Sequence, residues 1–99
     1  MITIKKIARR SIFNLGETEF AVILWMLRYA SWDGHFVFGP KAMWFASEAI
    51  GVSEKALTYG LIELTTKRIL RHGSSAKGHF VLSDEYFNFK QIEYKTDVQ

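Results

Sequence analysis

The sequence contains no cysteine, which excludes a disulfide-stapled scaffold and the cysteine-based zinc sites. Its three histidines, His35, His72 and His79, are too scattered along the chain to indicate a metal site. Long apolar runs are also lacking, because the longest, residues 20–27, is far shorter than the roughly 20 residues of a membrane-spanning helix. The N-terminus offers no apolar core of a signal peptide. We therefore expect a soluble, cytoplasmic protein that holds no metal and no other cofactor.

Groupings of residues that are typical of catalysis are absent as well. The sequence has no paired carboxylates in an apolar setting, and no serine or cysteine nucleophile near a histidine and an aspartate. Residues 73–78 are rich in glycine and serine but lack the Lys-Ser/Thr ending of a phosphate-binding loop. We expect no enzymatic activity.

Hydrophobic residues make up 48% of the 99 residues, which supplies one core in a chain too short for two. We predict one domain over residues 17–89, preceded by a basic N-terminal arm, residues 1–16, and followed by a polar tail, residues 90–99. The apolar residues of the arm fit either a short strand or a basic helix. Positive charge gathers in two blocks around a nearly neutral centre, one with Lys5, Lys6, Arg9 and Arg10 and the other with Lys67, Arg68, Arg71 and Lys77.

Periodic apolar residues predict the first helix of the domain over residues 17–31. Acidic residues lie at its start and Arg28 near its end, which suits the helix dipole. Its buried face is predicted from three- and four-residue spacing to consist of Phe20, Ile23, Leu24, Leu27 and Ala30. A turn at Asp33-Gly34 and a short strand over residues 36–38 follow.

Two further helices are predicted, separated by a three-residue turn. Pro40 suits the first position of a helix over residues 40–50 because its missing N–H would have no partner inside the helix. Gly51 is predicted to end that helix in a left-handed conformation, and Ser53 to cap the next helix. The second helix carries leucines on one face, at positions Leu57, Leu61 and Leu64, which we expect in the core.

A basic hairpin is predicted after these helices. Residues 69–72 and 79–82 form its strands, and residues 73–78 form its flexible tip. Ser83 is then expected to cap a single helical turn that contains Tyr86 and Phe87.

The run from Phe45 to Ser53, followed by the three leucines and by Ile69-Leu70, resembles the winged helix-turn-helix pattern. In such proteins a small residue lets the two helices cross closely, a glycine makes the turn and a serine caps the second helix. The resemblance covers roughly residues 17–89. It implies an α+β fold of three helices and a small antiparallel sheet with a β-hairpin wing, in the order α-β-α-α-β-β.

The sequence departs from this pattern at two positions. Ala46 lies five residues before Gly51, where four is more usual. Arg68 stands where the pattern often has a glycine, which disfavours a left-handed cap at that point and adds a positive charge beside the wing.

In size the chain resembles small plasmid- and phage-borne members of this superfamily. These include centromere-binding proteins of plasmid partitioning, relaxosome accessory proteins of conjugative plasmids and replication-initiator domains. The resemblance implies sequence-specific binding of double-stranded DNA and a role in plasmid or phage DNA maintenance or transfer. Other proteins of such a nucleoprotein complex would be further partners.

The basic hairpin and arm are better suited to DNA than the second helix of the motif. The outer face of that helix offers two acids, Glu54 and Glu63, against Lys55, whereas binding to phosphates requires clustered positive charge. A wing can instead follow a minor groove. The candidate DNA-binding residues are Lys67, Arg68, Arg71, His72, Ser74, Ser75, Lys77 and His79 around the hairpin, Lys5, Lys6, Arg9 and Arg10 in the arm, and Lys55 and Thr58 on the motif helix.

Exposed apolar residues on the helices predict a homodimer, with an interface that includes Trp25, Tyr29, Tyr59 and Ile62. Two alternatives stay open. The first is a transcriptional repressor that inserts the motif helix into the major groove in the standard way. The second is a winged helix that binds proteins and no nucleic acid, which exposure of Trp25, Trp32 or Trp44 would favour.

Overall fold

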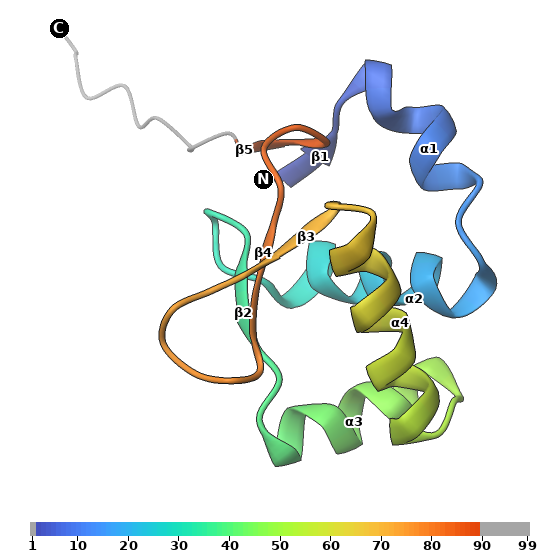
Figure 1. Cartoon of the computed structure of the whole chain (residues 1–99), viewed down its shortest axis with the longest axis vertical. Helices are drawn as coiled ribbons and strands as arrows, with labels where there is room; N and C mark the ends of the chain where they lie inside the picture. The colour runs from blue at the N-terminus through green and yellow to red at the C-terminus, as the bar shows by residue number, and fades with distance from the viewer. Residues whose placement is uncertain (1, 90–99) are drawn as a thin grey trace, which may run out of the picture.

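Three helices and a three-stranded antiparallel sheet form the centre of the structure, a computed structural model that describes residues 2–89 (Figure 1). The helices are α2 (Glu17–Tyr29), α3 (Pro40–Ile50) and α4 (Glu54–Thr66). The strands β2 (His35–Val37), β3 (Leu70–His72) and β4 (His79–Leu82) pair in the order β2-β4-β3. The fold is therefore α+β, and these six elements follow one another in the predicted order, α2-β2-α3-α4-β3-β4.

Local signals in the sequence set the connection between α3 and α4. Gly51 ends α3 with φ of 84°, in the left-handed region that glycine adopts without strain. Ser53 caps α4, since its Oγ accepts a hydrogen bond from the backbone N–H of Ala56 at 3.0 Å. Both predictions are confirmed. Ala46 and its neighbour Ser47 are both buried, so small side chains line the inner face of α3 before the turn.

Arg68 adopts the left-handed conformation that its side chain disfavours, with φ of 64°. The left-handed cap that the sequence disfavours at this position is therefore present. The backbone N–H of Ile69 donates to the Leu64 carbonyl at 3.0 Å, and both side chains are buried, so the end of α4 closes as a Schellman motif. Hydrogen bonding and burial on either side therefore hold Arg68 in a conformation that costs free energy.

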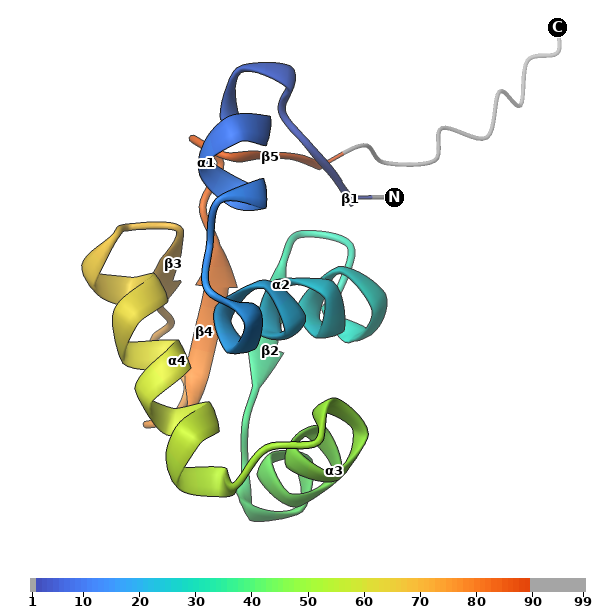
Figure 2. The same cartoon turned by 90° about the vertical axis from the view of Figure 1, so that its right-hand side faces the viewer.

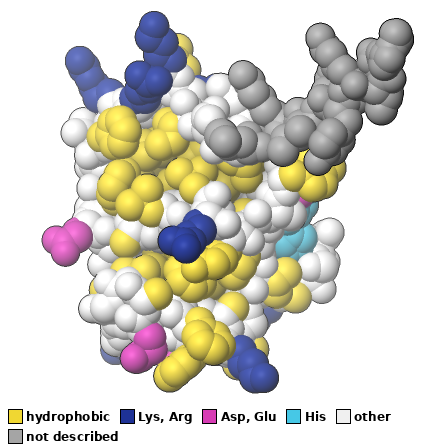
Figure 3. Space-filling view, turned by 180° about the vertical axis from the view of Figure 1, so that it is seen from behind, with side chains coloured by type: hydrophobic (Ala, Val, Ile, Leu, Met, Phe, Trp, Pro, Cys, Tyr) yellow, Lys and Arg dark blue, Asp and Glu magenta, His cyan; other side chains and the backbone are white. Residues whose placement is uncertain are grey.

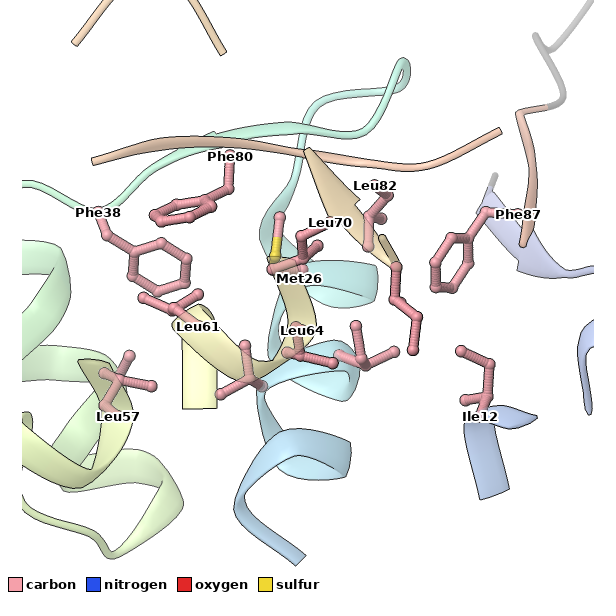
Figure 4. Packing of buried hydrophobic residues seen from close by; sticks show 14 of the residues in the cluster. Ile12, Met26, Phe38, Leu57, Leu61, Leu64, Leu70, Phe80, Leu82 and Phe87 are labelled. Atoms are coloured by element: carbon pink, nitrogen blue, oxygen red, sulfur yellow. The ribbon is translucent and has the colours of Figure 1, made fainter. Parts of the chain in front are cut away.

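α4 directs Leu57, Leu61 and Leu64 into the core, as predicted, where they meet side chains from α2 and the sheet (Figure 4). The predicted face of α2 is partly wrong. α2 fully buries Val22, Ile23 and Met26, whereas Leu24 is 49% exposed. Because α2 is apolar on nearly every side, the spacing of its apolar residues does not specify which side meets the core.

α2 also ends at Tyr29, before the predicted residue 31. Ser31 ends the helical path because its backbone and side chain close a turn instead. Its N–H donates to the His35 carbonyl at 2.9 Å, and its Oγ accepts from the His35 N–H at 3.1 Å. This turn delivers the chain directly into β2.

The first residues of the chain are folded onto the domain. β1 (Ile2–Ile4) is followed by the 3-10 helix η1 (Lys6–Ala8) and the short helix α1 (Arg9–Phe13). β1 pairs antiparallel with β5 (Phe87–Phe89) in a second, two-stranded sheet, with Ile4 opposite Phe87. Ala8 and Ile12 are buried in the common core. Residues 2–16, predicted as an arm outside the domain, thus share its core.

The single turn that the sequence predicts after the hairpin is confirmed in part. Ser83 caps it, since its Oγ accepts from the Glu85 N–H at 3.2 Å, and the turn contains Tyr86 but ends at Phe87, where β5 begins. The N–H groups of Tyr86 and Phe87 donate to the Ser83 carbonyl at 3.1 Å, which closes the turn, and Phe87 then enters the strand. The predicted polar tail, residues 90–99, lies outside the described residues. Within residues 2–89, no helix combines the length and the apolar character needed to cross a lipid bilayer.

Candidate nucleic-acid interface

The hairpin of β3 and β4 presents most of its predicted DNA-binding side chains to solvent. Arg71 and His72 are exposed on β3, and the loop that follows exposes Ser74, Ser75 and Lys77. Two cations, two hydroxyls and an imidazole are therefore exposed on β3 and on the loop after it, and this loop projects from the molecule in Figure 1. Side chains of these kinds bind phosphate oxygens and the edges of a minor groove.

Gly78 fixes the base of this hairpin. Its carbonyl accepts a hydrogen bond from the Phe38 N–H at 2.8 Å, which ties the hairpin to the segment between β2 and α3. A Cβ added to Gly78 would collide with the Phe38 carbonyl oxygen. The loop is therefore held at a defined position beside the amino-terminal half of α4 rather than swinging freely.

His79 is turned inward and is only 7% exposed, so the structure does not offer it for DNA contact as predicted. Its Nδ1 lies 3.0 Å from the Ser75 backbone N and 2.9 Å from Ser75 Oγ. Its Nε2 lies 2.8 Å from His35 Nδ1 on β2. His79 thus positions the loop, and the side chains on either side of it make the exposed surface.

The second basic region belongs to η1 and α1. Lys6, Arg9 and Arg10 are exposed there, and Lys5 is half-buried. This region stands at one end of the molecule, well away from the hairpin loop, in two perpendicular views (Figures 1 and 2). The structure therefore places the two predicted basic regions at separate positions rather than in one patch.

Lys67 and Arg68 lie between these regions, at the end of α4. Lys67 Nζ is 3.3 Å from Glu19 Oε1, so its charge is partly offset. Tyr86 connects this turn to the N-terminal segment, since its hydroxyl lies 3.5 Å from the Lys67 carbonyl and its own carbonyl accepts from the Lys5 N–H at 2.8 Å. The pair is therefore linked to the N-terminal segment through Tyr86.

The outer face of α4 is as poor in positive charge as the sequence predicts. Lys55 and Thr58 are exposed, but so are Glu54 and Glu63. The Thr58 hydroxyl donates to the Glu54 carbonyl at 2.9 Å, so its hydrogen is already used inside the helix. Among the described residues, this face offers a single cation against two carboxylates.

An apolar groove separates α4 from the hairpin. It encloses about 650 Å³ and its lining is mostly hydrophobic, with Val37, Phe38, Met43, Leu61, Ile62 and Phe80 as its apolar residues. Lys77 is the one cation in its lining and Glu54 also lines it, so phosphates seated here would lose water and gain little positive charge. This groove further disfavours α4 as the main phosphate-binding surface.

Comparisons of this chain with protein-family models, with curated proteins and with solved structures find no match. The interface is therefore defined by the chain's own residues alone. Within residues 2–89, no three histidine, cysteine, aspartate or glutamate side chains come together in a way that could hold a metal ion.

The predicted dimer residues lie in three separate surface depressions. Trp25 and Tyr29 stack at 4.3 Å between ring centroids and line a depression between α2 and α3. Tyr59 lines a second one beside Glu17, and Ile62 lies in the groove next to the hairpin. The sequence did not point to Phe45, which lines the first depression and is exposed.

Hydrophobic side chains cover much of the face opposite that of Figure 1 (Figure 3). Tyr29 and Phe45 are both more than one-third exposed, and they share one depression of about 490 Å³ with Trp25 and Phe36. Exposed aromatic residues gathered in this way are typical of surfaces that bind another protein.

Proposed function

We propose that this chain is a winged helix-turn-helix protein that binds double-stranded DNA and has no enzymatic activity. The observation that carries the proposal is the succession α2-β2-α3-α4-β3-β4, with a three-residue connection between α3 and α4 and an exposed basic hairpin. In this proposal α3 and α4 are the helix-turn-helix, and β3 and β4 are the wing. The protein acts in the cytoplasm as an accessory factor in plasmid or phage DNA maintenance or transfer, by the resemblance of its sequence.

In the proposed mode the wing makes the main DNA contact. Arg71 and Lys77 neutralise phosphates or enter a minor groove, and Ser74 donates to phosphate oxygens, while the Ser75 hydroxyl lies against His79. The N-terminal basic residues, with Lys67 and Arg68 beside them, contact the duplex at a second position. The acidic outer face of α4 and the apolar groove beside it support this assignment over standard docking through Lys55 and Thr58.

Salt dependence of duplex binding tests the proposal. Binding of a mixed-sequence duplex should weaken linearly on a logarithmic scale as salt rises, with a slope near −0.9 for each phosphate neutralised. Footprinting on bound fragments then identifies a preferred sequence. Absence of any duplex binding at about 50 mM salt, where electrostatic attraction is strong, would contradict the proposal.

We further propose a homodimer that forms through the depression between α2 and α3. Tyr29→Glu, at a half-exposed position, should lower the mass measured by sedimentation equilibrium toward that of a monomer. Tyr59→Glu and Ile62→Glu introduce the same charge at the other two depressions and should leave the mass unchanged. A lower mass for Tyr59→Glu or Ile62→Glu, with Tyr29→Glu unchanged, would instead place the dimer interface on α4.

A second candidate function is the binding of a protein without nucleic acid. Trp32 and Trp44 favour it, since they are 59% and 49% exposed. Exposed tryptophans are enriched where proteins contact one another. Duplex binding with a steep salt dependence argues against this alternative as the sole function, and lack of retention on both DNA and heparin would favour it.

A further inference from the structure

Ile7 is the most exposed of the large hydrophobic side chains in the described residues, at 88%. It lies in the middle of η1, at the end of the molecule that carries the second basic region (Figure 1). A partner that covers a branched aliphatic side chain so fully in water gains binding free energy from its burial.

The turn that carries Ile7 is held rigidly from both sides. Before it, β1 pairs with β5, and the Lys5 N–H donates to the Tyr86 carbonyl at 2.8 Å. After it, Ala8 and Ile12 are buried in the core. Ile7 is therefore presented at a fixed position, as a projecting side chain on a supported turn.

The charged residues of the segment that carries Ile7, residues 2–16, are all positive, while the turn that Lys5 contacts through Tyr86 carries Asp84 and Glu85. Lys6, Arg9 and Arg10 are exposed, and no acidic residue occurs before Glu17. An exposed isoleucine flanked by basic residues fits a polyanionic partner that offers apolar surface between its charges. A DNA duplex meets both requirements, because its base pairs can part at a step while its phosphates lie on either side.

A lipid surface fits these observations less well. A stable interfacial anchor needs a broad apolar face or two separate signals. α1 is only five residues long and turns Ile12 into the core. Phe13 on α1 is 60% exposed and packs its ring edge-on against Phe20 at 5.8 Å between centroids. Ile7 and this partly packed ring do not make a broad apolar face.

We propose that Ile7 is a wedge that enters a base-pair step from the minor groove, while Lys6, Arg9 and Arg10 bind the flanking phosphates. The inserted side chain unstacks the step and kinks the duplex toward the major groove. This inference deepens the proposed function and depends on it, since it assigns a bending activity to the second DNA contact.

The test measures bending and binding separately on one probe, a mixed-sequence duplex of about 30 base pairs with a donor and an acceptor dye at its ends. Such a duplex is short against the DNA persistence length of about 150 base pairs, so it stays nearly straight when free. The full-length protein should raise energy transfer on binding. Ile7→Ala should abolish that rise and weaken binding by no more than about fivefold, because the phosphate contacts remain.

Two further variants make the result specific. Ile7→Leu keeps an aliphatic wedge and should retain the bend. Leu24→Ala removes an aliphatic side chain that is 49% exposed on α2, one turn before Arg28 and outside the basic region of η1 and α1, and should leave both bending and binding as in the wild type. Because Ile7 is nearly free of protein contacts, none of these changes should unfold the chain.

Three outcomes would overturn the wedge. Wild-type protein that binds the duplex without bending it would remove the wedge and leave the proposed function intact. Equal bending by Ile7→Ala and the wild type would do the same. No duplex binding, with Ile7-dependent retention on vesicles of phosphatidylserine and phosphatidylcholine, would overturn both proposals and assign this end of the molecule to membranes.

Discussion

His79 Nε2 lies 2.8 Å from His35 Nδ1, and this contact joins the hairpin to β2. The protonation of both rings follows from Ser75, because its backbone N can only donate to His79 Nδ1. The hydrogen of the neutral His79 ring is then on Nε2 and is donated to His35. The hydrogen of His35 is on its own Nε2, which faces Asp33 Oδ2 at 3.7 Å.

Loss of the acceptor at His79 Nδ1 would break this chain at Ser75. At the other end of the chain, the hydrogen bond from the Ser31 hydroxyl lowers the pKa of the Asp33 carboxyl, which favours the negative charge that faces His35.

We therefore predict that His79 protects the Ser75 amide from exchange with solvent. His79→Ala should lower that protection about two- to tenfold, as expected for one net hydrogen bond. Amide exchange corrected for intrinsic rates measures this. His72→Ala, at an exposed position on β3, serves as the control. Unchanged protection in His79→Ala would refute the network.

Arg68→Gly should stabilise the protein by about 0.5–1 kcal/mol. Glycine adopts the left-handed conformation without the strain that costs a side-chain-bearing residue about 1–2 kcal/mol. Part of this gain is lost because glycine has greater conformational freedom in the unfolded chain. Arg68→Ala removes the same charge without relieving the strain. Chemical denaturation should thus rank Arg68→Gly above Arg68→Ala, and equal stabilities would show that the backbone strain is not real.

Leu64→Ala should lower the free energy of unfolding by about 2–5 kcal/mol, because Leu64 is fully buried where α4 meets the core. Urea denaturation measures the loss. Leu24→Ala, at its half-exposed position, should cost less than about 1 kcal/mol. Similar costs at both positions would contradict the assignment of α4's leucines to the core.

The elements fixed by local chemistry could be predicted from the sequence. Pro40, Gly51 and Ser53 each act within one helical turn, and α3 begins and ends where they indicate. The pairing of β1 with β5 could not be predicted in this way. It joins residues from opposite ends of the described chain, and neither three-residue strand carries a periodic signal of its own.

The sequence predicted which residues belong to the candidate site better than it predicted where each of them lies. Arg71 and Lys77 are exposed on the hairpin, as expected of charged residues around a glycine-rich turn. His79 looks equivalent to them in the sequence but is buried, because β4 is the central strand of its sheet, all four of its residues are buried, and His35 on β2 contacts the His79 ring. Ile7 gave no signal, since a lone isoleucine in an ambiguous segment is ordinarily taken as a core residue.

Two exposed lysines provide the most direct test of the account. Lys77 lies on the hairpin loop and Lys55 on the outer face of α4, so replacing each by alanine removes one matched charge. Affinity for a mixed-sequence duplex should be measured for both variants over a range of salt concentrations, with Arg71→Ala and Thr58→Ala as a second pair. We predict that Lys77→Ala and Arg71→Ala weaken binding, and that each reduces the salt slope by about 1, while Lys55→Ala and Thr58→Ala leave both nearly unchanged. Greater losses in Lys55→Ala and Thr58→Ala would contradict the wing-first mode and assign DNA contact to α4.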